Sequence, residues 1–253
     1  MTSKLLAPPL TAPSNLQAVL KQQGFAVLGS DAVRALSGVG AADLLRLNSF
    51  WNDLPPDQYL KDGGRYRRRR HASFVSQGGV VSQYAHRAHW QPLSYNALHG
   101  GMLRWFEPLD VAMTSSVAWP ALISFLGCVA SGLRGEQPWF VEAHPFRIDT
   151  TDGIGRPTPE GAHRDGVDLV AVFLIGRQGI KGGETRVFDV SSPLGQRFTL
   201  TEPWSLLLLD DERMIHETTP IQPQSELGWR DTLVVTLRAG GFLDEPAQPN
   251  AQD

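Results

Sequence analysis

The stretch His163–Ile175, HRDGVDLVAVFLI, joins a short polar segment to an almost wholly apolar one. In its apolar part, residues 167–175, Asp168 is the only charged residue, and such a run is typical of a buried strand. Similar short runs, separated by Gly, Pro and Asp clusters, lie on both sides of it. The expected strands are residues 139–148, 167–175, 184–189, 197–200, 204–209, 214–218 and 230–238. Short strands without helices between them predict an antiparallel sandwich or barrel rather than a parallel βαβ fold.

The first half of the chain has a different pattern, in which apolar residues recur at helical spacing. We expect helices over residues 14–23, 41–54 and 109–133, and a short strand over residues 25–28. The last of these helices is apolar enough to pack over a sheet. The predicted fold class is therefore mainly β with N-terminal helices (α+β).

We expect one domain over residues 1–253, because no internal repeat and no low-complexity linker interrupts the chain. Residues 1–13 are predicted to form a loose Pro-rich arm, and residues 244–253 a polar tail. Residues 14–135 are expected to give mostly helical support with edge strands. Residues 136–240 are expected to form the barrel core that carries the metal site.

Composition and charge exclude several classes of protein. The 253 residues are 42% hydrophobic and 19% charged, which is ordinary globular composition. A net charge of −3 excludes a broadly basic nucleic-acid-binding protein, and the lone Cys128 excludes an intrachain disulfide framework. No apolar run reaches the length of a membrane span, and the N-terminus lacks the apolar segment of a signal peptide. We therefore expect a cytoplasmic protein that binds a small molecule and neither nucleic acid nor membrane.

His163 and Asp165 lie two positions apart, so their side chains share a face in an extended segment. An imidazole nitrogen and a carboxylate oxygen are both metal ligands, and one more histidine would complete a set of three. His216, in the expected strand 214–218, is the candidate third ligand. Two histidines and one carboxylate with open coordination positions are the pattern of non-haem Fe(II) oxygenases.

The last expected strand begins with Arg230, after His216 in the chain. Strand alternation places Arg230 and Thr232 on one face, where a guanidinium and a nearby hydroxyl suit a carboxylate. Arg238 lies roughly 26 Å further along an extended strand and cannot serve the same site. We expect Arg230 to bind an anionic group, the alternative being a solvated arginine on an edge strand.

Several ordered motifs surround these residues. They are PTPEGAHRDGVD at 157–168, GGET at 182–185, DDERMIH at 210–216, TPI at 219–221 and WRD at 229–231. Together they resemble the 2-oxoglutarate/Fe(II)-dependent dioxygenase family. The similarity is to the branch of bacterial free amino-acid hydroxylases that includes isoleucine dioxygenase and biofilm-stress-and-motility protein A. It extends over roughly residues 60 to 240.

This resemblance implies a double-stranded β-helix (jelly-roll or cupin-like) barrel in which His163, Asp165 and His216 hold Fe(II). It implies 2-oxoglutarate as co-substrate and O2 as oxidant. The implied reaction hydroxylates a small, aliphatic amino acid or an amino-acid derivative, with release of succinate and CO2. Arg230 would bind the distal carboxylate of 2-oxoglutarate, with Thr232 as a helper. Arg147, on the strand before the metal loop, is a second basic candidate, and a cross-strand ion pair is its alternative role.

The basic run RYRRRR is a candidate for the substrate side of the pocket. In an extended conformation Arg68 and Arg70 share one face, and Arg67 and Arg69 share the other, so one pair can face a cavity. We take Arg68 and Arg70 as candidate substrate residues. A nucleic-acid patch is the less favoured alternative, because the chain is net acidic.

Asp168, close behind the metal pair, is a further candidate substrate residue. Four other histidines are expected to be structural or exposed: His86, His89, His99 and His144. We expect none of them to have a carboxylate partner at two-residue spacing, as His163 has.

The same ligand set is compatible with two other functions. A cupin-type metal-dependent hydrolase or isomerase would use a metal-activated water, and a non-catalytic barrel would only bind a small ligand. The hydrolase leaves Arg230 and Thr232 without a role. Succinate formation from 2-oxoglutarate distinguishes the oxygenase from both.

Overall fold

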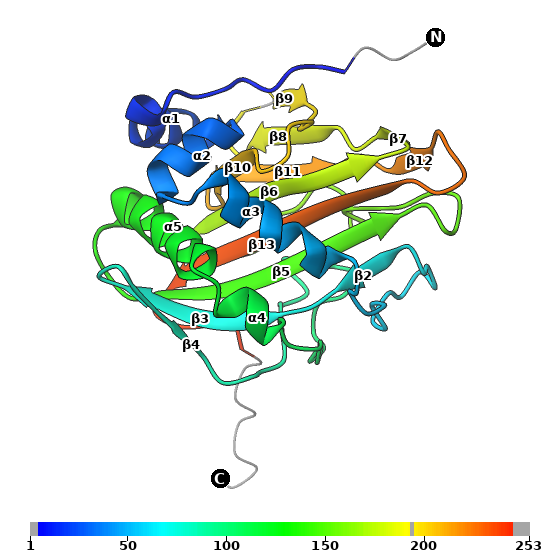
Figure 1. Cartoon of the computed structure of the whole chain (residues 1–253), viewed down its shortest axis with the longest axis horizontal. Coiled ribbons are helices and arrows are strands. Elements are labelled where there is room, and N and C mark those ends of the chain that lie inside the picture. The colour runs from blue at the N-terminus through cyan, green and yellow to red at the C-terminus, as the bar shows by residue number, and fades with distance from the viewer. Residues whose placement is uncertain (1–4, 193–194, 245–253) are drawn as a thin grey trace, which may run out of the picture.

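The structure is a computed structural model that describes residues 5–192 and 195–244 (Figure 1). Its helices are η1 (Pro13–Asn15), α1 (Leu16–Gln23), α2 (Ser30–Ser37), α3 (Ala41–Leu47), η2 (Asn48–Trp51), α4 (Val111–Thr114) and α5 (Ala118–Arg134). Its strands are β1 (Phe25–Leu28), β2 (Arg67–Arg69), β3 (Ala72–Gln77), β4 (Val80–Gln83), β5 (Trp139–Asp149), β6 (Leu169–Gln178), β7 (Ile180–Gly182), β8 (Thr185–Asp189), β9 (Gly195–Phe198), β10 (Leu206–Asp210), β11 (Met214–Thr218), β12 (Ile221–Pro223) and β13 (Trp229–Ala239). Residues 245–253 of the expected polar tail lie outside the described residues.

The strands form antiparallel sheets of unequal size. The large sheet has the order β1-β10-β6-β13-β5-β3-β4, with β2 paired to β5 beside β3. A second sheet has the order β11-β8-β9, and β12 pairs with β7. The predicted class, mainly β with N-terminal helices, is confirmed.

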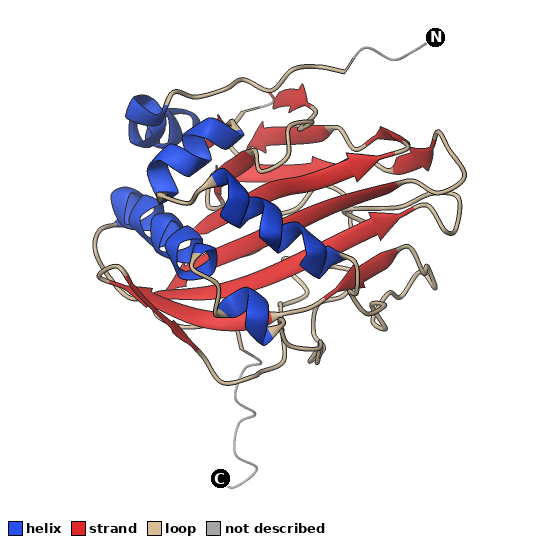
Figure 2. Cartoon of the chain, in the orientation of Figure 1, coloured by secondary structure: helices blue, strands red, loops and turns tan. Residues whose placement is uncertain are grey.

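Strand β13 lies at the centre of the large sheet and alternates sharply between its two faces. Leu233, Val235 and Leu237 are fully buried in the core that the helices share with the sheet. The helices lie together on this face (Figure 2). The residues that alternate with them, such as Thr232 and Val234, point to the opposite face, toward the cavity described below.

Helix α5 covers the sheet because its apolar residues recur every three or four positions. Trp119, Leu122, Ile123 and Leu126 are all buried in the core shared with the sheet. Gly127 permits close contact with β3, since a Cβ added there would lie 2.6 Å from Ser76 Oγ. A second core cluster joins the two sheets, with residues from β6 and β10 against residues from β8 and β11.

Two expected helices are shorter than predicted. The helix over 41–54 ends at Leu47 and continues as η2. The helix over 109–133 is divided into α4 and α5, and the Asp110 side chain caps α4 by accepting from Ala112 N at 2.7 Å. Pro120 lies in the first turn of α5, where its missing N–H costs no helical hydrogen bond. The proline therefore lies near the start of α5, inside the segment that was expected to be one helix.

The N-terminal half contributes more to the sheet than the sequence indicated. Strand β1 forms one edge of the large sheet and β4 forms the other, but β3 lies inside it. The described part of the expected loose arm lies against β1, because Thr11 N donates to Val27 O at 2.7 Å. Backbone pairing to an open strand edge orders this Pro-rich segment.

No helix in the described ranges is long and apolar enough to cross a bilayer.

We expect Leu233→Ala to lower the free energy of unfolding by about 2–5 kcal/mol, because it leaves a cavity in the core under α5. The matched control is Val80→Ala on β4, where the side chain is 67% exposed and the expected loss is below about 0.5 kcal/mol. Equilibrium unfolding in urea measures both values. Equal losses in the two variants would contradict this account of the core.

Candidate active site

Two histidines from distant parts of the chain meet through their backbones. His163 N donates to His216 O at 3.0 Å, and His216 N donates to His163 O at 2.9 Å. This antiparallel bridge attaches the loop before β6 to strand β11 and leaves the two rings on one side, with centroids 4.6 Å apart. The backbone pairing therefore sets the spacing of the two imidazoles.

Asp165 completes a cluster of three side chains, which we call the triad: His163, Asp165 and His216. Asp165 Oδ1 lies 3.9 Å from His163 Nε2, and its Oδ2 lies 3.9 Å from His216 Nε2. His163 Nδ1 lies 2.9 Å from Gly161 O, which can only accept, so Nδ1 carries the proton and Nε2 presents its lone pair. The three donor atoms lie within 4.8 Å of one another, and the set is suited to a metal ion.

The Asp211 carboxylate holds the loop that carries Asp165. It accepts hydrogen bonds from Asp165 N at 3.0 Å, Gly166 N at 2.7 Å and Val167 N at 3.1 Å. Gly166 has a φ of 80°, and a Cβ there would lie 2.5 Å from the Tyr95 ring, so glycine is required. Asp211 thus fixes the turn that follows the His-x-Asp pair.

The two triad imidazoles differ in their electrostatic surroundings. Burial alone would lower the pKa of His163, but the charges of Asp165 and Glu160 outweigh it, and the pKa is raised. Burial and the neighbouring His163 hold the pKa of His216 well below its usual value. A bound cation would therefore compete with a proton mainly at His163.

One cavity joins the triad to Arg230. Thr232 and Val234 continue its wall along β13, as the alternation predicted from the sequence requires. Val167 and Val172 add apolar wall beside the triad. The cavity lining therefore combines the triad, which we call the metal-binding corner, with arginines and with aliphatic side chains.

Arg230 is 3% exposed, and its Nε is buried without a partner. Within the described residues its guanidinium has no hydrogen bond or ion pair. Burial and the nearby Arg177 lower its pKa to about 10, which still leaves it charged at neutral pH. A buried, charged and unpaired guanidinium facing a cavity is a binding site for an anion.

Arg147 does not face this cavity, so its expected role with an anionic ligand is wrong. It lies opposite Asp231 in the β5–β13 register and forms a bidentate ion pair with it, at 2.8 Å and 2.7 Å. The Arg147 guanidinium also lies over the Trp229 ring, 4.9 Å from its centroid. The alternative role, a cross-strand ion pair, is the one the structure shows.

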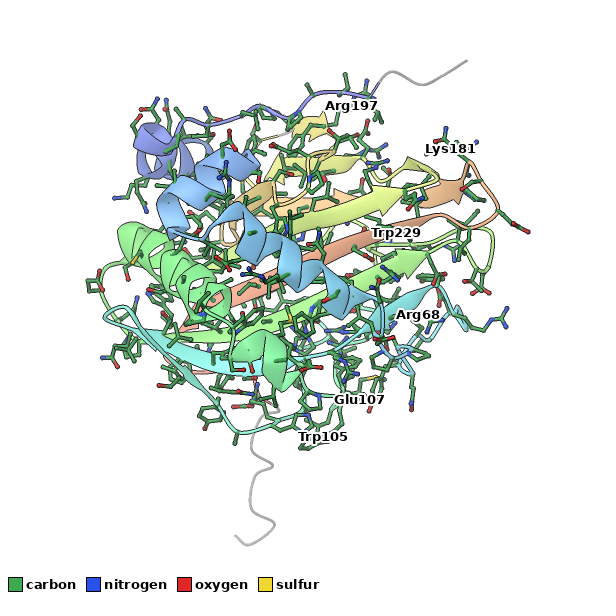
Figure 3. The ribbon with its side chains drawn as sticks, in the orientation of Figure 1. Arg68, Trp105, Glu107, Lys181, Arg197 and Trp229 are labelled. Carbon is green, nitrogen blue, oxygen red and sulfur yellow. The ribbon has the colours of Figure 1, made fainter. Side chains whose placement is uncertain are left out.

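The arginines of β2 have the expected alternation, but the opposite pair faces the cavity. Arg67 and Arg69 line it. Arg68 is half-exposed, with its Nε 3.6 Å from Asp149 Oδ2, at the same end of the large sheet as Trp229 (Figure 3). Arg70 points away and donates to Glu107 Oε2 at 2.8 Å. The sequence defined the two faces but not which of them would be buried.

Asp168 also lies outside the cavity. Its Oδ2 accepts from Ala239 N at 2.8 Å, and its Oδ1 lies 3.5 Å from Arg134 Nε. These contacts connect the start of β6 with α5 and with the end of β13. Asp168 is therefore placed as a structural residue rather than a substrate residue.

A second buried group that could hold a metal ion was missed: His71, His89, Glu142 and His144. His89 and His144 were expected to be structural or exposed, yet both are buried and line the cavity with Glu142. Glu142 precedes His144 by two residues on the same face of β5, which reverses the order of the His163 motif. The expectation that His144 has no carboxylate at two-residue spacing is therefore wrong. A search on both sides of each histidine would have found this pair, although not its contact with His71 and His89.

Glu142 already has donors around it. Its Oε1 accepts from His71 Nε2 at 3.0 Å, His89 Nδ1 at 3.3 Å and Arg87 Nη1 at 3.1 Å. Burial would raise the pKa of Glu142, but these neighbours lower it, and the group is ionised. Arg87 supplies the counter-charge. Of the two metal-capable groups found among residues 5–192 and 195–244, the triad is therefore the one that no arginine side chain neutralises.

A family model described as 2OG-Fe dioxygenase matches residues 48–236. The chain belongs to the 2OG-Fe dioxygenase family. The family predicted from the sequence motifs is thereby confirmed, and with it an enzyme that uses Fe(II) and 2-oxoglutarate. No curated protein matches the sequence.

The chain is also similar to several solved structures. A bsmA homologue from Methylobium petroleophilum PM1 is 51% identical, with a TM-score of 0.89 over 95% of this chain and 98% of its own. IDO from Bacillus thuringiensis is 15% identical, with a TM-score of 0.73 over 92% and 100%. The Fe(II)/α-ketoglutarate-dependent dioxygenase TqaL is 22% identical, with a TM-score of 0.69 over 89% and 86%. IDO and TqaL, at these identities, share the fold of this chain.

We expect Asp211→Ala to weaken Fe(II) binding by about 10- to 100-fold, because three backbone N–H groups lose the carboxylate that orders the Asp165 turn. Glu212→Ala, next in the chain and exposed, is the matched control. Equilibrium titration with Fe(II) under nitrogen measures the affinity, and circular dichroism checks the fold. Unchanged affinity in Asp211→Ala would show that the turn is held by other contacts.

Proposed function

We propose that this 2OG-Fe dioxygenase hydroxylates a small, aliphatic amino acid or amino-acid derivative, with release of succinate and CO2. The triad would hold Fe(II), and Arg230 would hold 2-oxoglutarate. The observation that carries the proposal is that the triad and an unpartnered buried arginine line one cavity. The proposed architecture is one domain, in which the two sheets form the double-stranded β-helix of the family.

The donor chemistry of the triad fits Fe(II). Two imidazoles and one carboxylate are borderline and hard ligands, and a set of three leaves coordination positions for other molecules. Gly161 O fixes the tautomer of His163, and Asp211 holds the turn next to Asp165. Bound Fe(II) and 2-oxoglutarate supply the oxidising chemistry, in which O2 is consumed and 2-oxoglutarate becomes succinate and CO2.

Arg230 suits the distal carboxylate of 2-oxoglutarate. Its guanidinium is charged and has no protein partner among the described residues. Thr232 lies on the same face of β13 and supplies a hydroxyl donor nearby. A co-substrate carboxylate would satisfy both groups and remove the cost of a buried unpaired charge.

The apolar part of the cavity lining supports a substrate with a short apolar side chain. Val167, Val172 and Val234 line it together with Phe146. These side chains exclude water from the space beside the triad and offer only dispersion contacts. Membership of the family favours the oxygenase over the hydrolase, which left Arg230 without a role.

With Fe(II), 2-oxoglutarate and air, we expect one or more of the amino acids in a full panel to stimulate succinate formation. Asp165→Ala should abolish this turnover by removing the anionic metal ligand, and a chelator should do the same to the unmodified enzyme. The control is Asp168→Asn, which lies outside the cavity. Full activity of Asp165→Ala would disprove the assignment of the triad.

We expect Arg230→Gln to raise the KM for 2-oxoglutarate by about 10- to 100-fold, since a charge-assisted contact with the distal carboxylate is lost. Arg238→Gln, eight residues along the same strand and outside the cavity, should leave this KM unchanged. Initial rates of succinate formation measure it. An unchanged KM in Arg230→Gln would exclude Arg230 as the carboxylate partner.

A further inference from the structure

A second group of arginines lines the same cavity on the other side of β5: Arg67, Arg69 and Arg104. They are 5%, 4% and 2% exposed. Each has a buried guanidinium nitrogen that lacks a partner in the described structure: Arg67 Nη2, Arg69 Nε and Arg104 Nε. Buried donors of this kind are costly unless a ligand occupies them.

The remaining contacts of these side chains fix their positions. Arg67 Nε donates to Asp57 Oδ2 at 2.7 Å. The Arg69 guanidinium lies between two rings, 3.9 Å from the centroid of Phe106 and 4.3 Å from that of Phe146. Such stacking holds a planar guanidinium. Its Nη2 lies 2.6 Å from His144 Nδ1, so its Nε is the buried nitrogen left for a ligand.

Arg104 is connected to the triad through one side chain. Its Nη2 donates to Gln91 Oε1 at 2.9 Å, and Gln91 Nε2 donates to Asp165 Oδ1 at 3.2 Å. Asn96 Nδ2 also donates to Gln91 Oε1, at 3.1 Å, which fixes the amide orientation. An anion on Arg104 would therefore lie next to the metal-binding corner.

The local charges do not balance. In the described structure Asp57 is the carboxylate that forms ion pairs with this group, with Arg67 and, at 4.0 Å, with Arg69. Burial, opposed by Asp57, and repulsion from Arg67 lower the pKa of Arg69. Glu142 does not supply the missing negative charge, because Arg87 pairs with it. Glu160 lines the same cavity and its charge acts on Arg104, but three guanidiniums still outnumber the two carboxylates Asp57 and Glu160.

This arginine group is separate from Arg230. In the strand register Ile148 of β5 is the partner of Arg67 on one side and of Arg230 on the other. The cavity thus carries one basic position on each side of β5. Two separate positions suit two anions, one from the co-substrate and one from the substrate.

We propose that Arg69 and Arg104, supported by Arg67, bind the carboxylate of the substrate while 2-oxoglutarate occupies Arg230. This proposal rests on the proposed function, and it adds which chemical group of the substrate the enzyme recognises. The Glu160 carboxylate lines the same cavity, with its Oε1 3.4 Å from His163 Nε2. Its Oε2 is buried without a partner among the described residues and offers an acceptor for a substrate cation. Opposite charges on one cavity wall suit a zwitterionic head group, and Glu160 disfavours a doubly charged phosphate.

The test measures binding without turnover. Enzyme loaded with Fe(II) and 2-oxoglutarate under nitrogen is titrated calorimetrically with a panel of amino acids and with the carboxamide of each. We expect at least one acid to bind about 10- to 100-fold more tightly than its amide. Arg69→Gln and Arg104→Gln should remove most of this preference. Arg68→Gln, on the opposite face of the same strand, should keep it.

Arg69→Lys and Arg104→Lys preserve the charge and are the variants to use if the glutamine forms do not fold. Affinity for 2-oxoglutarate should stay unchanged in all of them. Two results with the unmodified enzyme alone would overturn the proposal. One is equal affinity for each amino acid and its carboxamide, and the other is that no amino acid in the panel binds. An unchanged preference in Arg69→Gln and Arg104→Gln would overturn it too. Failure of the proposed function would instead appear as absence of succinate formation.

Discussion

The alternation of β13 is the constraint on which the site depends. This strand is hydrogen-bonded to β5 on one side and to β6 on the other, so its side chains can point only to the two faces of the sheet. Leu233 and Val235 are held by the helical core, and that burial forces Arg230, Thr232 and Val234 into the cavity. A shift of one residue in the pairing register of β13 would turn its apolar side chains into the cavity and the Arg230 charge into the core.

The metal-binding corner depends on a second backbone constraint. The two hydrogen bonds between His163 and His216 join the loop before β6 to the second sheet. Asp211, just before β11, binds the backbone of the same loop, so it couples Asp165 to the strand that carries His216. The three donors are therefore placed by main-chain contacts, and their geometry does not rely on the side chains alone.

The sequence predicted the residues whose role follows from local spacing. His163 and Asp165 share a face because they are two positions apart, and Arg230 shares a face with Thr232 for the same reason. The predicted role of Arg147 in anion binding was wrong, because spacing within one strand does not show which residue lies opposite on the neighbouring strand. In the fold that residue is Asp231. The buried group of His71, His89, Glu142 and His144 was missed because its members are far apart in the sequence. They come from β5, from the segment before β3 and from the long loop after β4.

By itself, the sequence determined the family, the class of fold, the candidate triad and the alternation of each strand, because all of these depend on residue order. Only the tertiary structure decided which face of β2 is buried, and so placed Arg67 and Arg69, rather than Arg68 and Arg70, in the cavity. Only the fold brought Arg104 and Gln91 from a long loop to Asp165. The physical reason is that periodicity divides a strand into two faces, but burial of one face depends on what the rest of the chain packs against it.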